Sequence, residues 1–502
     1  MKTRIIPTVT AALLLLSIFL VLGACTTNEE KDKGSSSGSF TEGSEDSRYT
    51  PNVPEGISFD GATFSVLSID PSLYASTITD FDFDESPEDV VQEAIYNRNR
   101  KIEAEYGVEF ESTYVNISET LPTLQTQWTA QEDNYQLIML ISREAFPAAI
   151  EGMTLTPDTI PYADFSQPWY MSKVNDTLTI SGTQLLAYTD ESMNTYMQTV
   201  CIFFNSEMIK NNTNLTSPYD MVKDGSWTLE NFYASALAAK NDANGDGTFS
   251  PLDGDVYGII SEIDMFWPAT WVGADTTTVT VDNDGMPEFT APTDQKLLDI
   301  LSKLNDVLKN DGFFLNTEKY YGSLDGDVCR DAGTQYFSHG GGLYRVGTVG
   351  NIQLLRSMEA DFGVVPLPKY DENQEEYLTR TIDGWLHVAP STVQNKEMLG
   401  VVLEALGAES KNLVIPAFFD KALDYKYIRD EDKETTKEML NIIFENATMD
   451  LGDTVWMANI RGPLCQVIES GKGNFSSKLA SLEMFVERNC IQTILDYIAQ
   501  KG

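Results

Sequence analysis

The sequence is poor in the residues on which much catalytic chemistry depends. Its 502 residues include only two histidines, His339 and His387, which leaves little material for a serine–histidine–aspartate triad or a histidine-rich metal site. The motifs of a nucleophile elbow, a zinc-protease helix and a phosphate-binding loop do not occur in it. The sequence therefore predicts a protein that is not an enzyme.

Basic residues are also scarce. The chain has 34 lysines and arginines against 76 aspartates and glutamates, a formal net charge of -42. Such a charge repels the phosphates of nucleic acids and disfavours attraction to anionic lipid. We attribute it to solubility and expect ligands to be neutral or cationic, although a local arginine can override the overall field.

Cysteines are few and widely spaced. After Cys25 the chain has Cys201, Cys329, Cys465 and Cys490, which form neither a CxxC pair nor a zinc-like cluster. Their spacing does not reveal whether they pair, so disulfides and buried free thiols both remain open.

The sequence contains a single long apolar run, and it lies at the N-terminus. Lys2 and Arg4 precede apolar residues 11–22, and small residues then lead to Cys25. This arrangement resembles the signal peptide and lipobox of bacterial lipoproteins. The resemblance implies cleavage after residue 24 and lipidation of Cys25, which would anchor the protein on the extracytoplasmic face of the cell membrane. The alternative is a transmembrane anchor, but a span needs about 20 apolar residues.

The segment that follows Cys25 is rich in serine, glycine, threonine and charge. A stretch of this composition buries too little apolar surface to offset its ordering entropy. We therefore expect residues 25–54 to be a flexible linker between the lipid and a globular body.

The body alternates strand and helix patterns. Strands are expected at residues 63–68, 108–115, 135–141 and 199–204. Ser86 and the acidic residues after it predict a helix start, and Gly107 predicts the C-cap of that helix. Alternating strands and helices favour an α/β fold with a mostly parallel sheet.

One loop resembles the calcium-binding loop of an EF-hand. Oxygen-bearing side chains alternate around Gly247, which permits the sharp turn that such a loop needs. The predicted metal ligands are Asp242, Asn244, Asp246, Thr248 and Asp253. Asp253 replaces the usual bidentate glutamate, and Asp255 is an alternative to it. The sequence predicts a structural Ca²⁺; the other interpretation is an acidic turn without metal.

Several short motifs together resemble the extracellular solute-binding proteins of carbohydrate ABC importers, the broad group that includes maltose-binding proteins. They occur in the expected order at residues 96–108, 203–208, 225–229, 361–368 and 389–392. The resemblance implies a two-lobed α/β fold of the periplasmic-binding-protein type, with a hinge and a ligand cleft between the lobes. The implied boundaries are 55–190 with 378–430 for lobe 1 and 191–377 with 431–502 for lobe 2.

A saccharide site needs aromatic faces for the sugar ring and polar groups for its hydroxyls. Some candidates follow predicted strand ends, where ligands bind in open α/β sheets, and others lie at the crossover or in segments that resemble family motifs. These candidates are Arg143, Glu144, Trp169, Asp190, Glu191, Trp271, Tyr344, Arg345 and Trp385.

The prediction from the sequence is a lipid-anchored protein that binds a solute, most simply a saccharide, and delivers it to an ABC import permease. A surface glycoside hydrolase is the alternative, because acid pairs are abundant and two carboxylates suffice for that chemistry. A calcium-dependent adhesion module is a third possibility, but only one EF-like loop is present.

Overall fold

The fold described below belongs to the unit Gly43–Gly502. The structure, a computed structural model, describes residues 48–73, 78–81, 85–282, 284–324, 329–382, 384–423 and 432–501. The predicted signal peptide, Cys25 and most of the predicted linker lie outside these residues and stay predictions.

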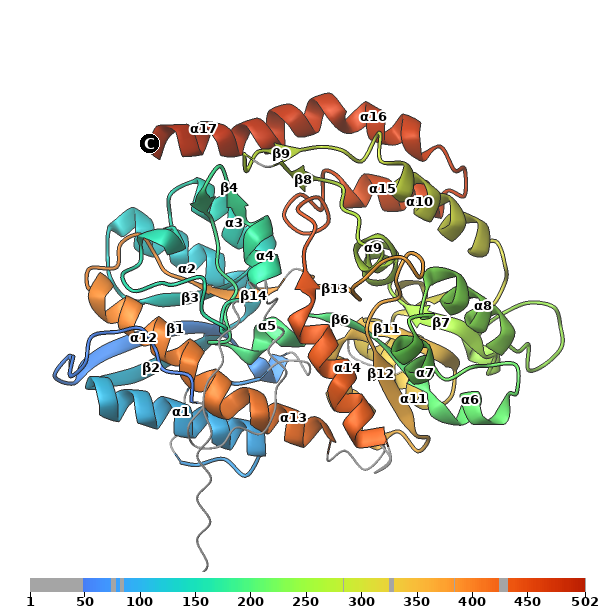
Figure 1. The fold of residues 1–502 in the computed structure, drawn as a ribbon, viewed down its shortest axis with the longest axis horizontal. Coiled ribbons are helices and arrows are strands. Elements are labelled where there is room, and N and C mark those ends of the chain that lie inside the picture. Colours follow the sequence, from blue (N-terminus) through green and yellow to red (C-terminus); the bar gives the residue numbers. More distant parts are fainter. Residues whose placement is uncertain are drawn as a thin grey trace, which may run out of the picture. The chain divides into compact units, whose positions relative to one another are not determined.

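The first sheet has the strand order β14-β3-β1-β2. β1 pairs in parallel with β2 and with β3, whereas β14 is antiparallel to β3. Helices α1, α2 and α12 pack around this sheet, and we call the sheet and its helices the first lobe (Figure 1). The bounds are β1 (Ala62–Ile69), β2 (Val108–Val115), β3 (Leu137–Ile141), β14 (Trp385–Val388), α1 (Val90–Tyr106), α2 (Ile117–Ala130) and α12 (Lys396–Glu409).

Local sequence explains most of this lobe. All five residues of β3 are buried, as expected for a strand covered on both faces. Gly107 ends α1 with a φ of 62°, a left-handed conformation that glycine adopts without strain. The predicted start of α1 at Ser86 is wrong. Asp89 is the N-cap instead, because its carboxylate accepts hydrogen bonds from the backbone of Val91 and Gln92.

The second sheet has the strand order β10-β7-β11-β6-β12. β6 is antiparallel to both of its neighbours, whereas β7 is parallel to β10 and to β11. We call this sheet and its helices the second lobe. The bounds are β6 (Val200–Asn205), β7 (Tyr257–Ser261), β10 (Phe314–Asn316), β11 (Gly342–Thr348), β12 (Phe362–Val365), α6 (Ser206–Asn211), α7 (Pro218–Asp224), α8 (Leu229–Ala239), α9 (Ile263–Gly273), α10 (Gln295–Val307), α11 (Cys329–Ser338) and α14 (Lys433–Glu445).

Three segments that are far apart in the sequence lie side by side between the two sheets. The short strands β13 (Thr379–Arg380) and β15 (Ala447–Thr448) pair in parallel. A bridge between Thr199 and Thr381 adds the third segment, which enters β6. The backbone nitrogen of Thr381 donates to the oxygen of Thr448 over 2.8 Å. We call these three segments the hinge, because the chain passes between the sheets through them.

The C-terminal helices extend beyond the second sheet. α15 (Arg461–Glu469) is followed by α16 (Phe475–Val486) and α17 (Gln492–Lys501), and a π-helical turn joins the last two. α16 contacts α10 and α15, and α17 continues toward the first-lobe side of Figure 1. The C-terminal residues thus form two consecutive helices.

Smaller elements complete the described part of the chain. None of its helices has the length and apolar character that a membrane span requires. The further elements are α3 (Ser142–Ile150), α4 (Ser172–Thr177), α5 (Met193–Met197), α13 (Ile415–Leu423), β4 (Thr179–Ile180), β5 (Thr183–Gln184), β8 (Thr280–Val281) and β9 (Pro287–Glu288).

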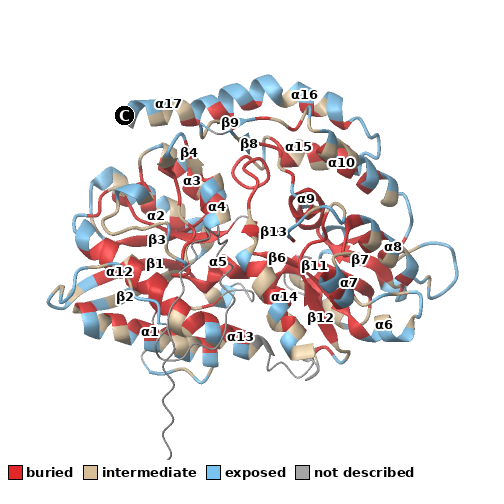
Figure 2. Cartoon of the chain, in the orientation of Figure 1, coloured by how far each residue is buried: buried red, intermediate tan, exposed pale blue. Residues whose placement is uncertain are grey.

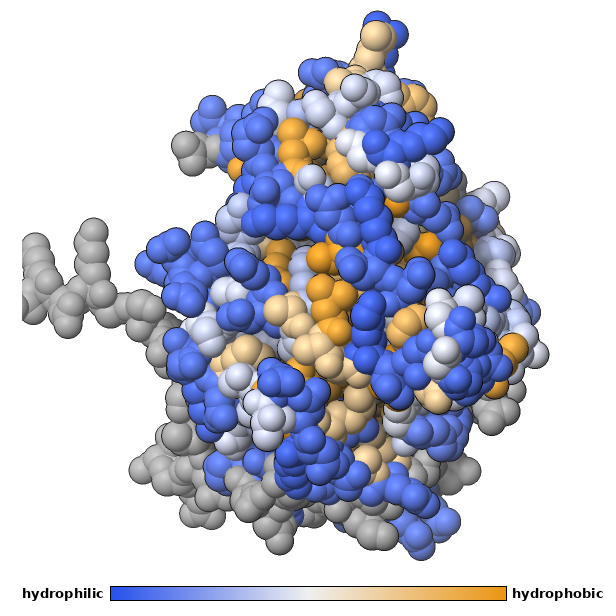
Figure 3. Space-filling view, turned by 90° about the vertical axis from the view of Figure 1, so that its right-hand side faces the viewer, coloured by the Kyte–Doolittle hydropathy of each residue, from blue (hydrophilic) through white to orange (hydrophobic). Residues whose placement is uncertain are grey.

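Buried residues run through both sheets, and exposed residues lie on the outer faces of the surrounding helices (Figure 2). On the face drawn in Figure 3, hydrophilic residues predominate and hydrophobic residues show mainly in a strip between them. All strands of the first sheet come from the segments predicted for lobe 1, and all strands of the second sheet from those predicted for lobe 2. The lobe boundaries themselves stay a prediction.

Candidate functional site

The carboxyl end of β3 brings three of the predicted ligand-binding residues together. The chain turns from Ile141 directly into α3, which carries Arg143 and Glu144. Trp385 stands opposite Ile141 in the neighbouring strand β14. One carboxylate oxygen of Glu144 is buried without a hydrogen-bond partner among the described residues, and burial raises the pKa of this carboxyl. This edge therefore combines an arginine, an unsatisfied carboxylate and an indole.

An aromatic pair connects this edge to the segment that follows the hinge. Phe146 of α3 packs edge-on against Trp456, with ring centroids 6.3 Å apart and an interplanar angle of 83°. Trp456 lies in the irregular segment between β15 and α15 and is 6% exposed. The sequence analysis missed Trp456, because no periodicity or motif marks this segment.

A buried cluster of charges holds the same segment beside the hinge. Arg380 of β13 donates through two nitrogens to the two carboxylate oxygens of Asp453 and through a third to the backbone oxygen of Met265. Arg461 lies 3.3 Å from Asp453 and 3.8 Å from Asp264. A buried carboxylate of this kind tolerates burial only because it is paired and hydrogen-bonded. The cluster therefore fixes the segment with Trp456 against β13 and α9.

The structure places Trp271 away from any open surface. Its ring is fully buried, and its indole nitrogen donates to Asp450 over 3.1 Å. Asp450 also accepts hydrogen bonds from Thr278. Burial raises the pKa of Asp450 to about 6, and the neighbouring charge of Asp453 adds to this effect. In this conformation Trp271 packs and hydrogen-bonds within the protein.

Tyr344 and Arg345 are likewise enclosed by protein. The ring of Tyr344 lies 4.9 Å from that of Phe232, and its hydroxyl group is 2.9 Å from that of Ser235. Arg345 donates from two nitrogens to the carboxylate of Glu262, with distances of 3.1 Å. Both side chains are fully buried within the second lobe, so the structure does not bring them to the edge that carries Glu144.

Trp169 packs on the first-lobe helix α12. It is 1% exposed and forms a cluster with Tyr170 and Ala408. A Cβ atom added to Gly407 would lie 2.4 Å from the Trp169 ring, so this glycine allows the close approach.

Asp190 and Glu191 form buried ion pairs where the chain leaves the first lobe. Asp190 lies 2.9 Å from the ammonium group of Lys411, and Glu191 lies 3.0 Å from Nδ1 of His387. Burial alone lowers the pKa of His387, but the Glu191 carboxylate outweighs it and the pKa is raised. Arg98 donates to the backbone oxygen of Glu191 over 2.7 Å. These pairs fix the crossover to the first sheet, and the sequence analysis missed the partners because they are distant in the chain.

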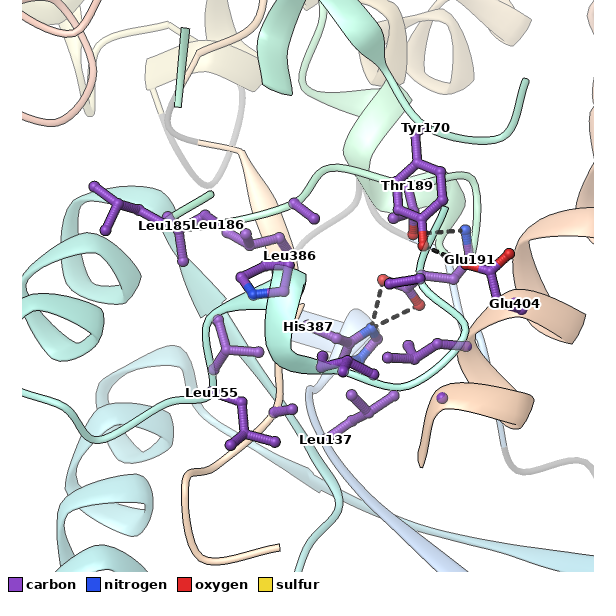
Figure 4. A pocket seen from close by; sticks show the side chains of 18 residues that line it. Leu137, Leu155, Tyr170, Leu185, Leu186, Thr189, Glu191, Leu386, His387 and Glu404 are labelled. Carbon is purple, nitrogen blue, oxygen red and sulfur yellow. Dashed lines mark hydrogen bonds and ion pairs between the residues drawn. The ribbon is translucent and has the colours of Figure 1, made fainter. Parts of the chain in front are cut away.

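A largely enclosed cavity lies beside these ion pairs (Figure 4). Its volume is about 50 Å³, and its walls are mainly leucine and other apolar side chains, with Tyr170, Thr189, Glu191, His387 and Glu404 as polar residues. Tyr170 donates a hydrogen bond to Glu404. Ligand pockets usually measure about 300 to 1,000 Å³, so this cavity has room for a few water molecules rather than for a sugar ring.

A larger polar groove lies over the hinge. Its volume is about 620 Å³, and hinge residue Thr448 and the adjacent Leu378 contribute to its lining. Lys173 of α4 and Glu376 both line it, and their charged atoms are 2.6 Å apart. The groove therefore borders the hinge, and its volume suits a small polar solute.

The predicted calcium loop is exposed and ordered by its own hydrogen bonds. Asp242 accepts from the backbone nitrogens of Gly245 and Gly247, and Asp246 accepts from that of Thr248. The fully buried Asp255 accepts from two backbone nitrogens, whereas Asp253 is exposed. Gly247 has a φ of 83°.

Within the described ranges no group of three or more histidine, cysteine, aspartate and glutamate side chains has a geometry that suits a metal ion. The calcium ion, with Asn244 among its ligands, stays a prediction. Cys201, Cys465 and Cys490 are free thiols.

Neither family models nor curated proteins match this chain. Solved structures do. A sugar-binding protein from Xanthomonas citri superposes with a TM-score of 0.57 at 14% identity, over 88% of this chain and 100% of the other. A solute-binding protein from Staphylococcus aureus in complex with maltose superposes with a TM-score of 0.52 at 12% identity, over 88% of this chain and 98% of the other. An ABC substrate-binding protein from Listeria monocytogenes in complex with cycloalternan superposes with a TM-score of 0.51 at 12% identity, over 86% of this chain and 99% of the other.

The chain has the fold of extracellular solute-binding proteins. This confirms the predicted fold class, an α/β periplasmic-binding-protein type, and it agrees with the two sheets and the three-segment hinge. The similar structures named above are described as binding proteins rather than enzymes. At 12–14% identity the likeness concerns the fold, so the function has to be argued from the site.

Proposed function

We propose that this protein captures a saccharide between its two lobes and delivers it unchanged to an ABC import permease. The observation that carries the proposal is the hinge, in which three hydrogen-bonded segments join two separate sheets. Such a connection lets two rigid lobes rotate about a few backbone positions and close on a ligand. Similar structures from three bacteria are described as sugar-binding, solute-binding and substrate-binding proteins, which supports the same function here.

The proposed ligand site lies between the carboxyl end of β3 and the segment that holds Trp456. Phe146 and Trp456 are buried against each other in this conformation, and their aromatic faces would suit the C–H faces of a sugar once the hinge opens. Glu144 supplies a carboxylate with an unused acceptor, which suits a sugar hydroxyl. Opening of the hinge would separate Phe146 from Trp456, because the two belong to segments on opposite sides of it.

The acidic side chain of the segment that holds Trp456 is engaged in ion pairs within the protein. Asp453 is bound on both oxygens by Arg380 and is also approached by Arg461. Because both oxygens of this acid are occupied by guanidinium groups, Asp453 has no free oxygen to present to a glycosidic bond. This supports the binding function over the glycoside hydrolase alternative, and analysis of the recovered glycan separates the two.

We further propose that the mature protein is tethered through lipidated Cys25 to the extracytoplasmic face of the cell membrane. The support is the lipobox-like sequence and the polar segment that follows it. We also propose a structural Ca²⁺ in the loop around Gly247. The support is the alternation of oxygen-bearing side chains in this loop and its sharp turn at Gly247.

The test combines calorimetry with small-angle scattering over a panel of neutral oligosaccharides. The wild-type protein should bind one or more glycans, become more compact on binding and return the glycan unaltered. Trp456→Ala should weaken binding by about 2 kcal/mol if the indole is a stacked hot spot. Trp128→Ala is the matched control, because Trp128 lies on α2 at a half-buried position of the first lobe and lines no site described above.

Glu144→Gln provides a second variant that keeps the shape of the side chain and removes its charge. Circular dichroism should establish that all variants are folded. Binding that leaves the envelope unchanged and is insensitive to both Trp456→Ala and Glu144→Gln would contradict the proposed site. A shortened glycan would contradict the proposed function.

A further inference from the structure

A second groove lies in the second lobe, separate from the proposed ligand site. It has a volume of about 360 Å³ and follows β10, which is an edge strand of the second sheet. Its lining residues fall within 249–320 and 468–471 and include residues of α9 and the ends of α10 and α15. Among the described residues, none from the first lobe or the hinge lines it. The volume lies in the range typical of small-ligand sites.

Aromatic side chains provide much of the lining of this groove. Phe249, Phe314 and Tyr320 are each half-buried, so part of each ring remains accessible. The ring centroids of Phe249 and Tyr257 are 5.7 Å apart, and those of Phe314 and Trp267 are 6.4 Å apart. Tyr257 and Trp267 are buried. Rings that are held by buried neighbours and remain partly accessible are well suited to stack on the apolar face of a ligand.

Two polar atoms in the wall of the groove have no hydrogen-bond partner in the part of the chain that the structure describes. Trp267 is 3% exposed and Asn305 is 7% exposed. The indole nitrogen of Trp267 and the side-chain oxygen of Asn305 are both buried without a hydrogen-bond partner among the described residues. Leaving such groups unsatisfied is unfavourable, and a native structure usually satisfies them with water or a ligand. The indole nitrogen of Trp267 is a donor and the side-chain oxygen of Asn305 is an acceptor. The hydroxyl groups of a ligand can accept from the first and donate to the second.

The charge of the groove narrows the class of ligand. Lys309 and Lys319 are balanced by Asp311 and Glu469, although the whole chain carries a formal charge of -42. A local balance of this kind favours a neutral ligand over an ion. An extended peptide could pair with the edge of β10, but that strand is three residues long and offers few backbone hydrogen bonds.

From these observations we infer that the groove along β10 is a second saccharide-binding site, which takes a neutral oligosaccharide by stacking on Phe314 and Tyr320. This site is independent of capture between the lobes. It would hold a glycan chain on the outside of the protein while the cleft binds a separate unit.

Hydrogen–deuterium exchange of the full chain tests this inference with maltotetraose, cellotetraose and xylotetraose as probes. At least one probe should protect residues 305–320, and the concentration at half-protection gives the affinity of the groove. Tyr320→Ala should weaken this affinity by about tenfold or more, as expected for the loss of a stacked ring. Tyr321→Ala is the matched control, because Tyr321 is the next residue, is 59% exposed and does not line the groove.

Protection of residues 449–461 reports separately on the site between the lobes, so the two proposals fail independently. The inference is overturned if no probe protects residues 305–320, or if Tyr320→Ala and Tyr321→Ala have equal effects. It is also overturned if these residues are protected by an unfolded peptide and by none of the three tetrasaccharides. Asn305→Leu removes the unpartnered acceptor and should also weaken binding, which checks the result should Tyr320→Ala prove unstable.

Discussion

The buried carboxyl of Glu404 should make the stability of the protein depend on pH. Glu404 lies on α12, is 1% exposed and accepts a hydrogen bond from Tyr170 beside the enclosed cavity (Figure 4). No ion pair with a basic side chain is present for it among the described residues. Burial raises the pKa of this carboxyl from 4.5 to about 7, and the hydrogen bond from Tyr170 offsets only part of that effect.

The magnitude follows from these two pKa values. A separation from 4.5 to about 7 corresponds to about 3 kcal/mol, at about 1.4 kcal/mol for each tenfold change in proton concentration. The folded protein keeps a proton that the unfolded chain releases between these values. The contribution of Glu404 to stability is therefore fully present below pH 4.5 and is lost as the pH rises through about 7.

Glu404→Gln keeps the shape of the side chain and an acceptor for Tyr170 but removes the ionisation. We expect the variant to equal the wild type near pH 4.5 and to exceed it by up to about 3 kcal/mol at pH 8. Urea unfolding of both proteins at several pH values measures this difference, in which the contributions of all other groups cancel. Glu397→Gln is the control, since Glu397 lies on the same helix and accepts from Tyr162 but is exposed. A difference between wild type and Glu404→Gln that does not change with pH would refute the reasoning.

Three further predictions concern single side chains. Glu191→Gln should lower the raised pKa of His387 and remove the stabilisation that this ion pair gives to the folded state below that pKa. An NMR titration of the histidines tests this, with the exposed His339 as internal reference. An unchanged titration curve of His387 would argue against the pairing. Calcium should raise the melting temperature of the wild type, and Asp246→Ala should abolish this rise. If neither calcium nor a chelator changes the melting temperature of the wild type, the calcium assignment is wrong. Cys25→Ser should prevent lipid labelling and release the protein from membranes, and continued labelling of this variant would contradict the anchor.

Local sequence determined the architecture well. The buried strand β3, the left-handed cap at Gly107 and the alternation of strands and helices all depend on residues close together in the chain. The start of α1 was misplaced, since Ser86 and Asp89 are both good N-caps and the sequence does not say which one the helix uses. The predicted strands at 135–141 and 199–204 differ from β3 and β6 by one or two residues at their ends.

The candidate site was only partly predictable. Arg143 and Glu144 could be found because they directly follow a recognisable strand, and ligands bind at such strand ends. Trp456 could not be found, because its position opposite Phe146 depends on the path of an irregular segment. Periodicity predicts nothing about such a segment.

The sequence by itself therefore determined the α/β class and the resemblance to solute-binding proteins, because both reside in short-range patterns that each segment carries alone. The tertiary structure decided which aromatic and charged side chains are enclosed by protein. Trp271 and Tyr344 are aromatic residues of the kind that stack on sugars, yet packing against distant segments buries both side chains. Glu191 meets His387 across 196 positions of sequence. Burial and pairing over such separations depend on how the whole chain folds, and no local pattern encodes them.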